Sequence, residues 1–295
     1  MTELSPAYNA RSINSVTQMD HDLYGFSALP QRPKLVWPNG ASVAMAVVVN
    51  VDYGDLATNP MNLVGFTHRD YGTRVGVFRL MDILDQLSIK ASMPISDVLL
   101  TRTPRVVEEA KKRGWELVGH GASVTQPVNS GLSEADERAY LQASFDALRD
   151  ATGAPPRGWL GPGNSQSART VGLLAELGYD YTLDWGNDDQ PYAFNVAKGQ
   201  LLAVPYSVET ADAAVIQAQN HTPWEYTKAL EDHLETLLAE GEKSGLVMTM
   251  GLQASVSGQP LRAKYIRSIL QKAKGTGKVW FATASEIADA YRTSL

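Results

Sequence analysis

Apolar residues in this chain follow two spacings, one typical of buried strands and the other typical of amphipathic helices. Residues 42–51 are rich in valine and alanine and nearly free of charge, which predicts a strand buried on both faces. Over residues 71–87 the apolar positions, among them Val77, Leu80 and Leu84, recur at helical spacing. The regular part of the chain is therefore predicted to begin with a strand followed by a helix.

The same alternation recurs along the rest of the chain. Further strands are predicted near residues 89–95, 115–119, 159, 179–183, 201–204, 246–250 and 278–281. Further helices are predicted over residues 105–113, 170–177, 226–239, 261–273 and 285–291, and from Ser133, a potential cap with Asp136 three residues later, to Thr152. Strands that alternate with helices indicate an α/β protein with a mostly parallel sheet, and about seven or eight such units suit a closed or nearly closed (β/α) barrel.

The first part of the chain differs from this pattern. Residues 1–40 lack sustained periodicity and contain Pro30, Pro33 and Pro38, which favours an arm that packs on the barrel. Residues 41–295 show neither an internal repeat nor a low-complexity segment, so we expect them to form a single domain.

Composition and charge narrow the possible functions. Hydrophobic residues make up 44% of the chain and charged residues 20%, which is typical of a globular protein. The 26 Lys and Arg against 32 Asp and Glu give a net charge of −6, and no basic run is present, so we expect no nucleic-acid partner. With no cysteine, the chain cannot form disulfides, thiolate zinc sites, iron–sulfur clusters or a cysteine nucleophile.

The hydropathy of the chain indicates the cellular compartment in which the protein is expected. Residues 1–20 are polar and lack the apolar core of a signal peptide, and the longest apolar run, residues 43–49, is too short to span a bilayer. We expect a cytoplasmic protein without a membrane partner. Its expected partners are a polar, planar small-molecule substrate and further copies of itself in a homo-oligomer.

Candidate chemistry gathers where the predicted strands end, because parallel barrel strands deliver their carboxyl ends to one rim. The candidates there are Asp52, His120, Asp184 and Gln253. A strand-end aspartate is often only a helix cap, and His120 has the alternative of a paired core histidine. Two carboxylates, an imidazole and a carboxamide on one rim nevertheless favour an active site.

Substrate-binding candidates surround these four residues. They are Tyr53, Arg74, Trp159, Asn164, Trp185 and Tyr206. The two tryptophans would either pack the rim or form the walls of a flat pocket for a planar ring. Arg74, together with Arg69, would either bind a substrate carboxylate or remain solvent-exposed or paired with Asp70.

Several segments resemble the polysaccharide deacetylase superfamily, and within it most closely the branch of allantoinases and cyclic-imide hydrolases. They are VVNVDYG at 48–54, GWELVGHG at 114–121, GW at 158–159, Asp184 with DDQPY at 188–192, VPY at 204–206, GLQ at 251–253 with GQP at 258–260, and VWFAT at 279–283. The resemblance runs from about residue 23 to residue 291. It implies a distorted (β/α) barrel of seven or eight strands and the hydrolysis of amide carbon–nitrogen bonds.

The chain departs from the motifs of the metal-dependent members of that superfamily. Their second acidic residue after the first strand is Tyr53 here, the second of their two loop histidines is Val124, and their seventh-strand histidine is Gln253. Only five histidines are present, and none has another within four residues: His21, His68, His120, His221 and His233. Because tyrosine, valine and glutamine are poor replacements for these ligands, we expect neither a metal nor another cofactor.

The expected reaction is a metal-independent hydrolysis of a small amide, imide or ureide. Asp52 would take a proton from water, and His120 would orient that water or protonate the leaving nitrogen. Tyr53 and Gln253 would donate to the oxyanion, and Asp184 would fix His120 or bind a substrate nitrogen. Two alternatives stay open: a lyase, isomerase or carbon–carbon hydrolase acting next to a carbonyl, and a barrel that binds a small ligand without turnover.

Overall fold

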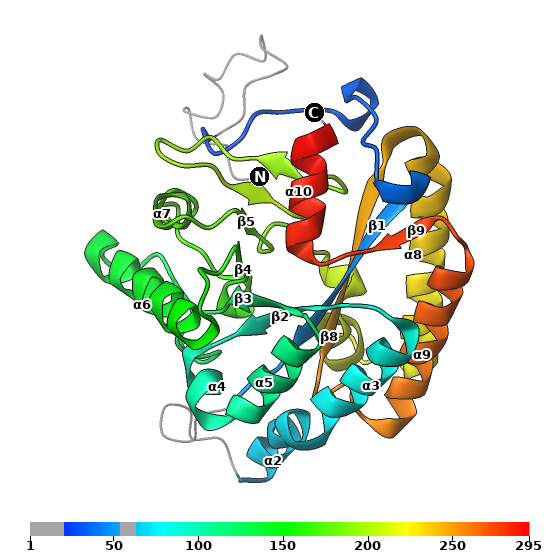
Figure 1. Cartoon of the computed structure of the whole chain (residues 1–295), viewed down its shortest axis with the longest axis horizontal. Helices are drawn as coiled ribbons and strands as arrows, with labels where there is room; N and C mark the ends of the chain where they lie inside the picture. Colours follow the sequence, from blue (N-terminus) through cyan, green and yellow to red (C-terminus); the bar gives the residue numbers. More distant parts are fainter. Residues whose placement is uncertain (1–20, 54–62, 295) are drawn as a thin grey trace, which may run out of the picture.

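The computed structural model describes residues 21–53 and 63–294, and its centre is a curved sheet with helices packed around it (Figure 1). The strands are β1 (Val43–Asn50), β2 (Ser92–Ile95), β3 (Glu116–Gly119), β4 (Gly158–Trp159), β5 (Tyr181–Thr182), β6 (Tyr192–Ala193), β7 (Leu202–Ala203), β8 (Leu246–Gln253) and β9 (Val279–Phe281). Their order is β6-β7-β5-β4-β3-β2-β1-β8, and β9 pairs with β1. Every pairing is parallel except β6 with β7.

Strand β1 organises the sheet. One edge pairs with β8 over its whole length, from Val43 opposite Leu246 to Asn50 opposite Gln253. The other edge pairs first with β9 and then, at Val48, with β2. Beyond β7, a single parallel bridge joins Ala211 to Gly251 of β8, so the sheet curls toward closure. This is the predicted distorted (β/α) barrel.

The two faces of β1 explain why the strand carries almost no charge. Val47 and Val49 belong to the core between the sheet and the outer helices. Ala44, Ala46 and Val48 face the barrel interior, where small side chains leave room for the neighbouring strands. Because both faces are buried, the strand is apolar throughout, as the sequence pattern predicts.

Helices cover the sheet from outside. They are α2 (Leu63–Tyr71), α3 (Val77–Leu87), α4 (Asp97–Arg102), α5 (Pro104–Lys112), α6 (Glu134–Thr152), α7 (Thr170–Leu177), α8 (Pro223–Ser244), α9 (Pro260–Gly275) and α10 (Ala284–Ser294). Helix α9 packs beside α8 and α3, next to the long strands β1 and β8 (Figure 1). In the described part of the chain, no helix is both long and apolar enough to cross a bilayer.

Most predicted elements are present. Helix α7 has the predicted bounds, and Ser133 caps α6 by accepting a hydrogen bond from the backbone N–H of Asp136 at 3.1 Å. Short elements without periodicity were not predicted, namely α2, α4 and the strand β6. Two or six residues are too few to establish a repeat, which explains the misses of β6 and α4.

The predicted helix over residues 71–87 is in fact two pieces. A π-helical turn, η3 (Gly72–Gly76), joins α2 to α3. A side chain at Gly76 would collide with the backbone carbonyl of Ala254, and one at Gly72 would lie 2.9 Å from the N of Ser255. The two glycines therefore let this turn pack directly against the loop that follows β8.

Residues 21–40 run along the barrel near the amino end of β8. The backbone N–H of Leu35 donates to the carbonyl of Ser244 at 2.8 Å, and the buried Trp37 donates its Nε1–H to the carbonyl of Leu246 at 3.0 Å. Arg32 forms an ion pair with Asp188 at 2.7 Å. The remainder of the predicted arm, residues 1–20, lies outside the described residues.

Candidate active site

The parallel pairing of β1 and β8 brings two predicted site residues into contact. Asn50, the last residue of β1, lies opposite Gln253, the last residue of β8. Asp52 follows two residues after Asn50, and the Nε2 amide group of Gln253 donates a hydrogen bond to Asp52 Oδ2. The carboxylate and the carboxamide therefore form one unit at the carboxyl end of the sheet.

His120 follows β3 and is only 7% exposed. Its Nδ1 lies 2.5 Å from the backbone carbonyl oxygen of Leu160. Since a carbonyl can only accept, Nδ1 carries the hydrogen and Nε2 of the neutral ring carries the lone pair. Burial lowers the pKa of His120, against the opposing effects of the Leu160 carbonyl and the charge of Asp52, so the neutral ring is favoured.

The surroundings of the Asp52 carboxyl group change its pKa in two opposing ways. Burial raises its pKa above the ordinary value, because the charged form loses hydration. Three effects oppose that rise: the charges of His120 and Arg69 and the hydrogen bond from Gln253. A carboxyl group with a raised pKa binds protons more readily than an exposed one, as a general base near neutral pH requires.

Asp184 is part of the same rim, and its contacts rule out one of the two roles predicted for it. Its Oδ1 accepts the backbone N–H of Gly161 at 2.7 Å, and its Oδ2 accepts from Gln166 at 2.5 Å and from the Thr182 hydroxyl at 3.1 Å. Burial raises its pKa to about 6. The first predicted role of Asp184, to fix His120, is wrong, because the Leu160 carbonyl orients that ring and Asp184 holds the loop after β4. Its second predicted role, to bind a substrate nitrogen, stays a prediction.

Asp212 belongs to the site's support and was missed from the sequence. Its two carboxylate oxygens lie 2.8 and 2.9 Å from the backbone N of Gln253, and its Oδ2 accepts the Ser257 hydroxyl at 2.5 Å. The side chain is buried, and burial raises its pKa to about 7. Asp212 stands between predicted elements and outside any motif, so only the folded chain reveals that it holds the end of β8.

Two tyrosines named as substrate-binding candidates lie close to these groups. The buried Tyr206 accepts a hydrogen bond from Asn50 Nδ2 at 3.2 Å, and its ring fits over Gly251, where any side chain would collide with the hydroxyl. Tyr53 follows Asp52 and packs its ring edge-on against Phe66, with centroids 6.4 Å apart. Both remain candidates for contacting a substrate.

The two predicted tryptophans pack against other aromatic rings, Trp159 in the core and Trp185 half-buried. Trp159 is fully buried and lies edge-on against Tyr179, with ring centroids 5.7 Å apart. Trp185 donates its Nε1–H to Gln166 at 3.1 Å and packs on Phe194. Of the two alternatives for Trp159, packing is correct and a pocket wall is wrong, because the side chain is fully buried. Trp185 mainly supports the loop held by Asp184.

The predicted roles of Arg74 and Asn164 receive no support from their positions. The side chain of Arg74 is 75% exposed and lies 3.5 Å from Asp70, which matches the ion-pair alternative, and its assignment to the substrate stays a prediction. Asn164 is exposed at the end of the short turn η4 (Pro162–Asn164), where it adopts a φ of 53°. Arg69, by contrast, acts electrostatically on Asp52.

Comparisons with known proteins agree with this architecture. Residues 58–182 match the family model described as Polysaccharide deacetylase. A Schizosaccharomyces pombe protein named "Putative polysaccharide deacetylase" is 26% identical over 298 residues, which cover 86% of this chain and 92% of that protein. The chain is thus similar to proteins described as polysaccharide deacetylases, and its residues 58–182 match the model of that family.

Solved structures show that the polysaccharide deacetylase fold extends over most of the chain. A Mycobacterium smegmatis protein of the same description is 26% identical with a TM-score of 0.80, covering 89% of this chain and 94% of its own. The Puue allantoinase is 23% identical with a TM-score of 0.82, covering 94% of this chain and 98% of its own. The curled, mostly parallel barrel is therefore the architecture of this family.

The metal site of the metal-dependent deacetylases does not fit the described residues of this rim. Within residues 21–53 and 63–294, no three His, Asp or Glu side chains lie close enough together to hold one ion. Asp52 and His120 offer two donors, whereas Gln253 turns its amide N–H toward Asp52 and Val124 has no donor. Such a site commonly needs three protein ligands, so no step is assigned to a metal here.

Proposed function

We propose that this protein hydrolyses a carbon–nitrogen bond in a small cyclic or linear amide, imide or ureide without a metal. The observation that carries the proposal is the partly buried Asp52 carboxyl group, held by Gln253 and close enough to His120 for their charges to interact. Family members are hydrolases of carbon–nitrogen bonds, and an allantoinase shares the fold. The reaction class is therefore expected to be hydrolysis.

The geometry supports a single-carboxylate mechanism. Ionised Asp52 takes a proton from a water molecule whose oxygen attacks the substrate carbonyl carbon. The lone pair on His120 Nε2 accepts the other hydrogen of that water and so orients it. When the carbon–nitrogen bond breaks, Asp52 gives its proton to the leaving nitrogen. Asp52 is then ionised again, as it was at the start of the reaction.

Gln253 has two roles in this mechanism. One Nε2 hydrogen is used by Asp52, which keeps the carboxylate oriented. The second Nε2 hydrogen, and the hydroxyl of Tyr53, are available to the oxygen on which negative charge develops. Because these donors are held by the ends of neighbouring strands, they need little rearrangement during the reaction.

The test of this proposal combines metal analysis with a substrate screen. Protein purified without chelator is measured by elemental mass spectrometry, then assayed on allantoin, hydantoin, succinimide and acyclic ureides with and without chelator. We expect less than one equivalent of divalent metal and an unchanged hydrolysis rate in chelator. One equivalent of zinc whose removal abolishes hydrolysis would contradict the metal-free mechanism.

The same screen separates the competing reaction class. Asp52 and His120 could also move a proton at a carbon next to a carbonyl, since burial raises the pKa of the Asp52 carboxyl group and keeps the His120 ring neutral with a free lone pair. In that case, substrate protons would exchange with deuterated solvent while no amine or ammonia is released. Release of the nitrogen product with uptake of one water favours the hydrolase.

A further inference from the structure

A cavity of about 550 Å³ lies beside the candidate active site. The described residues that line it are His68, Arg69, Gln217, Pro223, Ser255, Gln259, Leu261 and Arg262. They come from α2, from the loop after β8, from the starts of α8 and α9, and from the π-helical turn η6 (Ala213–Ala218). Hydrogen-bond donors from separate segments thus converge on one space.

Several residues that line this cavity are close in sequence to residues of the candidate active site, or act on them electrostatically. Ser255 stands two residues after Gln253, and η6 begins directly after Asp212, which binds the backbone of Gln253. Arg69 is close enough to Asp52 to stabilise its charged form. A molecule with one end over Asp52 could therefore reach the cavity with its other end.

The charges of the cavity favour an anion. Two arginines and a histidine line it, and its described lining residues include no Asp or Glu, although the chain as a whole carries a net charge of −6. Arg69 has no hydrogen bond or ion pair with any described residue, and the hydrogen bond of Arg262 to the Val256 carbonyl is long, at 3.4 Å. Among residues 21–53 and 63–294, neither guanidinium group has a carboxylate partner, so both can bind one from a ligand.

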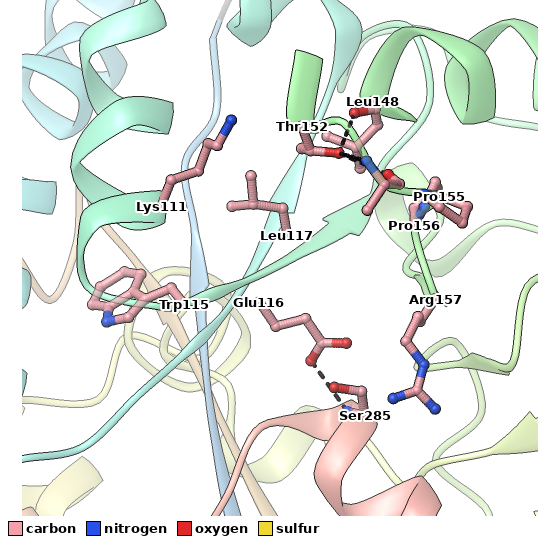
Figure 2. Close-up of a pocket in the computed structure, with 11 residues that line it drawn as sticks. Lys111, Trp115, Glu116, Leu117, Leu148, Thr152, Pro155, Pro156, Arg157 and Ser285 are labelled. Atoms are coloured by element: carbon pink, nitrogen blue, oxygen red, sulfur yellow. Dashed lines mark hydrogen bonds between the residues drawn. The ribbon is translucent and has the colours of Figure 1, made fainter. Parts of the chain in front are cut away.

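A second cavity, of about 380 Å³, shows the contrast (Figure 2). It lies at the amino end of β3 and β4, away from the candidate active site, and also contains charged groups. There, Arg157 pairs with Asp180 at 2.5 Å and with Asp289 at 2.6 Å, and Glu116 accepts the backbone N–H of Ser285 at 3.1 Å. The charged groups of this second cavity are paired within the protein, whereas Arg69 and Arg262 form no ion pair with any residue in the described part of the chain.

We propose that the cavity beside Asp52 binds a carboxylate of the substrate through Arg69 and Arg262, while the bond to be cleaved lies over Asp52. This inference rests on the proposed function and narrows its substrate class to amides, imides or ureides that also carry an acid group. Gln259, Gln217 and Ser255 supply further donors around that group. Leu261 and Pro223 provide an apolar wall for the carbon chain between the two ends.

Equilibrium binding tests this inference independently of turnover. Succinamate, which has one amide and one carboxylate, is compared with the neutral succinamide by isothermal titration calorimetry on the full chain. We expect wild-type protein and Asp52→Asn to bind succinamate at least about tenfold more tightly than succinamide, as charge-assisted hydrogen bonds imply. No preference for the acid in the wild type, whether from equal affinity or from absent binding, overturns the inference.

Variants of the two arginines test whether these residues cause the preference for succinamate over succinamide. Arg69→Gln and Arg262→Gln should each reduce the preference to about threefold or less, while Arg262→Lys keeps part of it because the charge remains. Arg267→Gln is the matched control, since Arg267 lies on α9, is similarly exposed and bonds to Gln86 outside the cavity. A preference that survives in both Gln variants with unchanged melting temperatures contradicts this site.

The outcomes for this inference and for the proposed function are distinguishable. Tight succinamate binding that depends on both arginines, with no hydrolysis of any amide, supports the acid-binding cavity and rejects the hydrolase. Hydrolysis of neutral imides by Asp52, with no acid preference in binding, supports the hydrolase and rejects the acid-binding cavity.

Discussion

At the scale of single residues, Gln253 defines the surroundings of the Asp52 carboxyl group. A carboxamide cannot move protons at neutral pH, but here it donates to Asp52 and lies at the end of β8. Removing it would take away the hydrogen bond that Gln253 donates to Asp52. We expect Gln253→Ala to lower kcat/KM on whichever substrate the screen identifies. The loss should correspond to about 1 to 3 kcal/mol of transition-state stabilisation.

Two comparisons sharpen that prediction. Gln142→Ala, which removes an exposed glutamine on α6, should leave kcat/KM unchanged. Gln253→His should change substrate preference or damage binding without simply giving allantoinase activity, because the partners around position 253 are arranged for an amide. Wild-type kinetics in Gln253→Ala would show that the residue does not act in the site.

Asp212 gives a prediction for the pH dependence of stability. Burial raises its pKa to about 7, so between about pH 4 and 7 the folded protein binds a proton that the unfolded chain has lost. Its contribution to the free energy of unfolding is therefore complete at about pH 4 and is lost as pH rises through 7. Urea unfolding at pH 4.5 to 8 should show wild-type stability falling relative to Asp212→Asn, and parallel curves would contradict this.

At the scale of elements, strands and helices with repeated patterns were predictable, whereas short connections were not. The valine and alanine run of β1 and the capped start of α6 follow from residue types and spacing alone. The η3 turn does not, because its cause is the backbone of the loop after β8, some 180 residues away in sequence. Only the folded chain brings those two segments together.

Gly76 provides the test of that packing. Adding a methyl group there would push α3 away from the Ala254 carbonyl, one residue after Gln253. We expect Gly76→Ala to destabilise the fold by about 1 to 3 kcal/mol in thermal denaturation, as other overpacked sites do. Gly172→Ala on α7, where a methyl group meets open space, should be neutral or stabilising by up to about 1 kcal/mol. Equal effects of the two substitutions would contradict the packing argument.

At the scale of the whole molecule, the rim was partly predictable because parallel strands deliver their ends to the same side. That rule predicts that Asp52, His120 and Gln253 lie on one rim. It could not show what each side chain contacts, so the Leu160 carbonyl on His120 and the support from Asp212 came only from the structure. Contacts across the fold depend on loop paths that no local pattern records.

The central claim is that Asp52 performs carbon–nitrogen hydrolysis without a metal, and one measurement tests it most directly. The turnover rate of metal-depleted wild-type protein is compared with that of metal-depleted Asp52→Asn on the amide, imide or ureide it hydrolyses. We predict at least about a hundredfold loss with an unchanged melting temperature, the lower end of what a positioned general base contributes. Near wild-type turnover in Asp52→Asn, or no turnover by the wild type until a divalent metal is added, would contradict the claim.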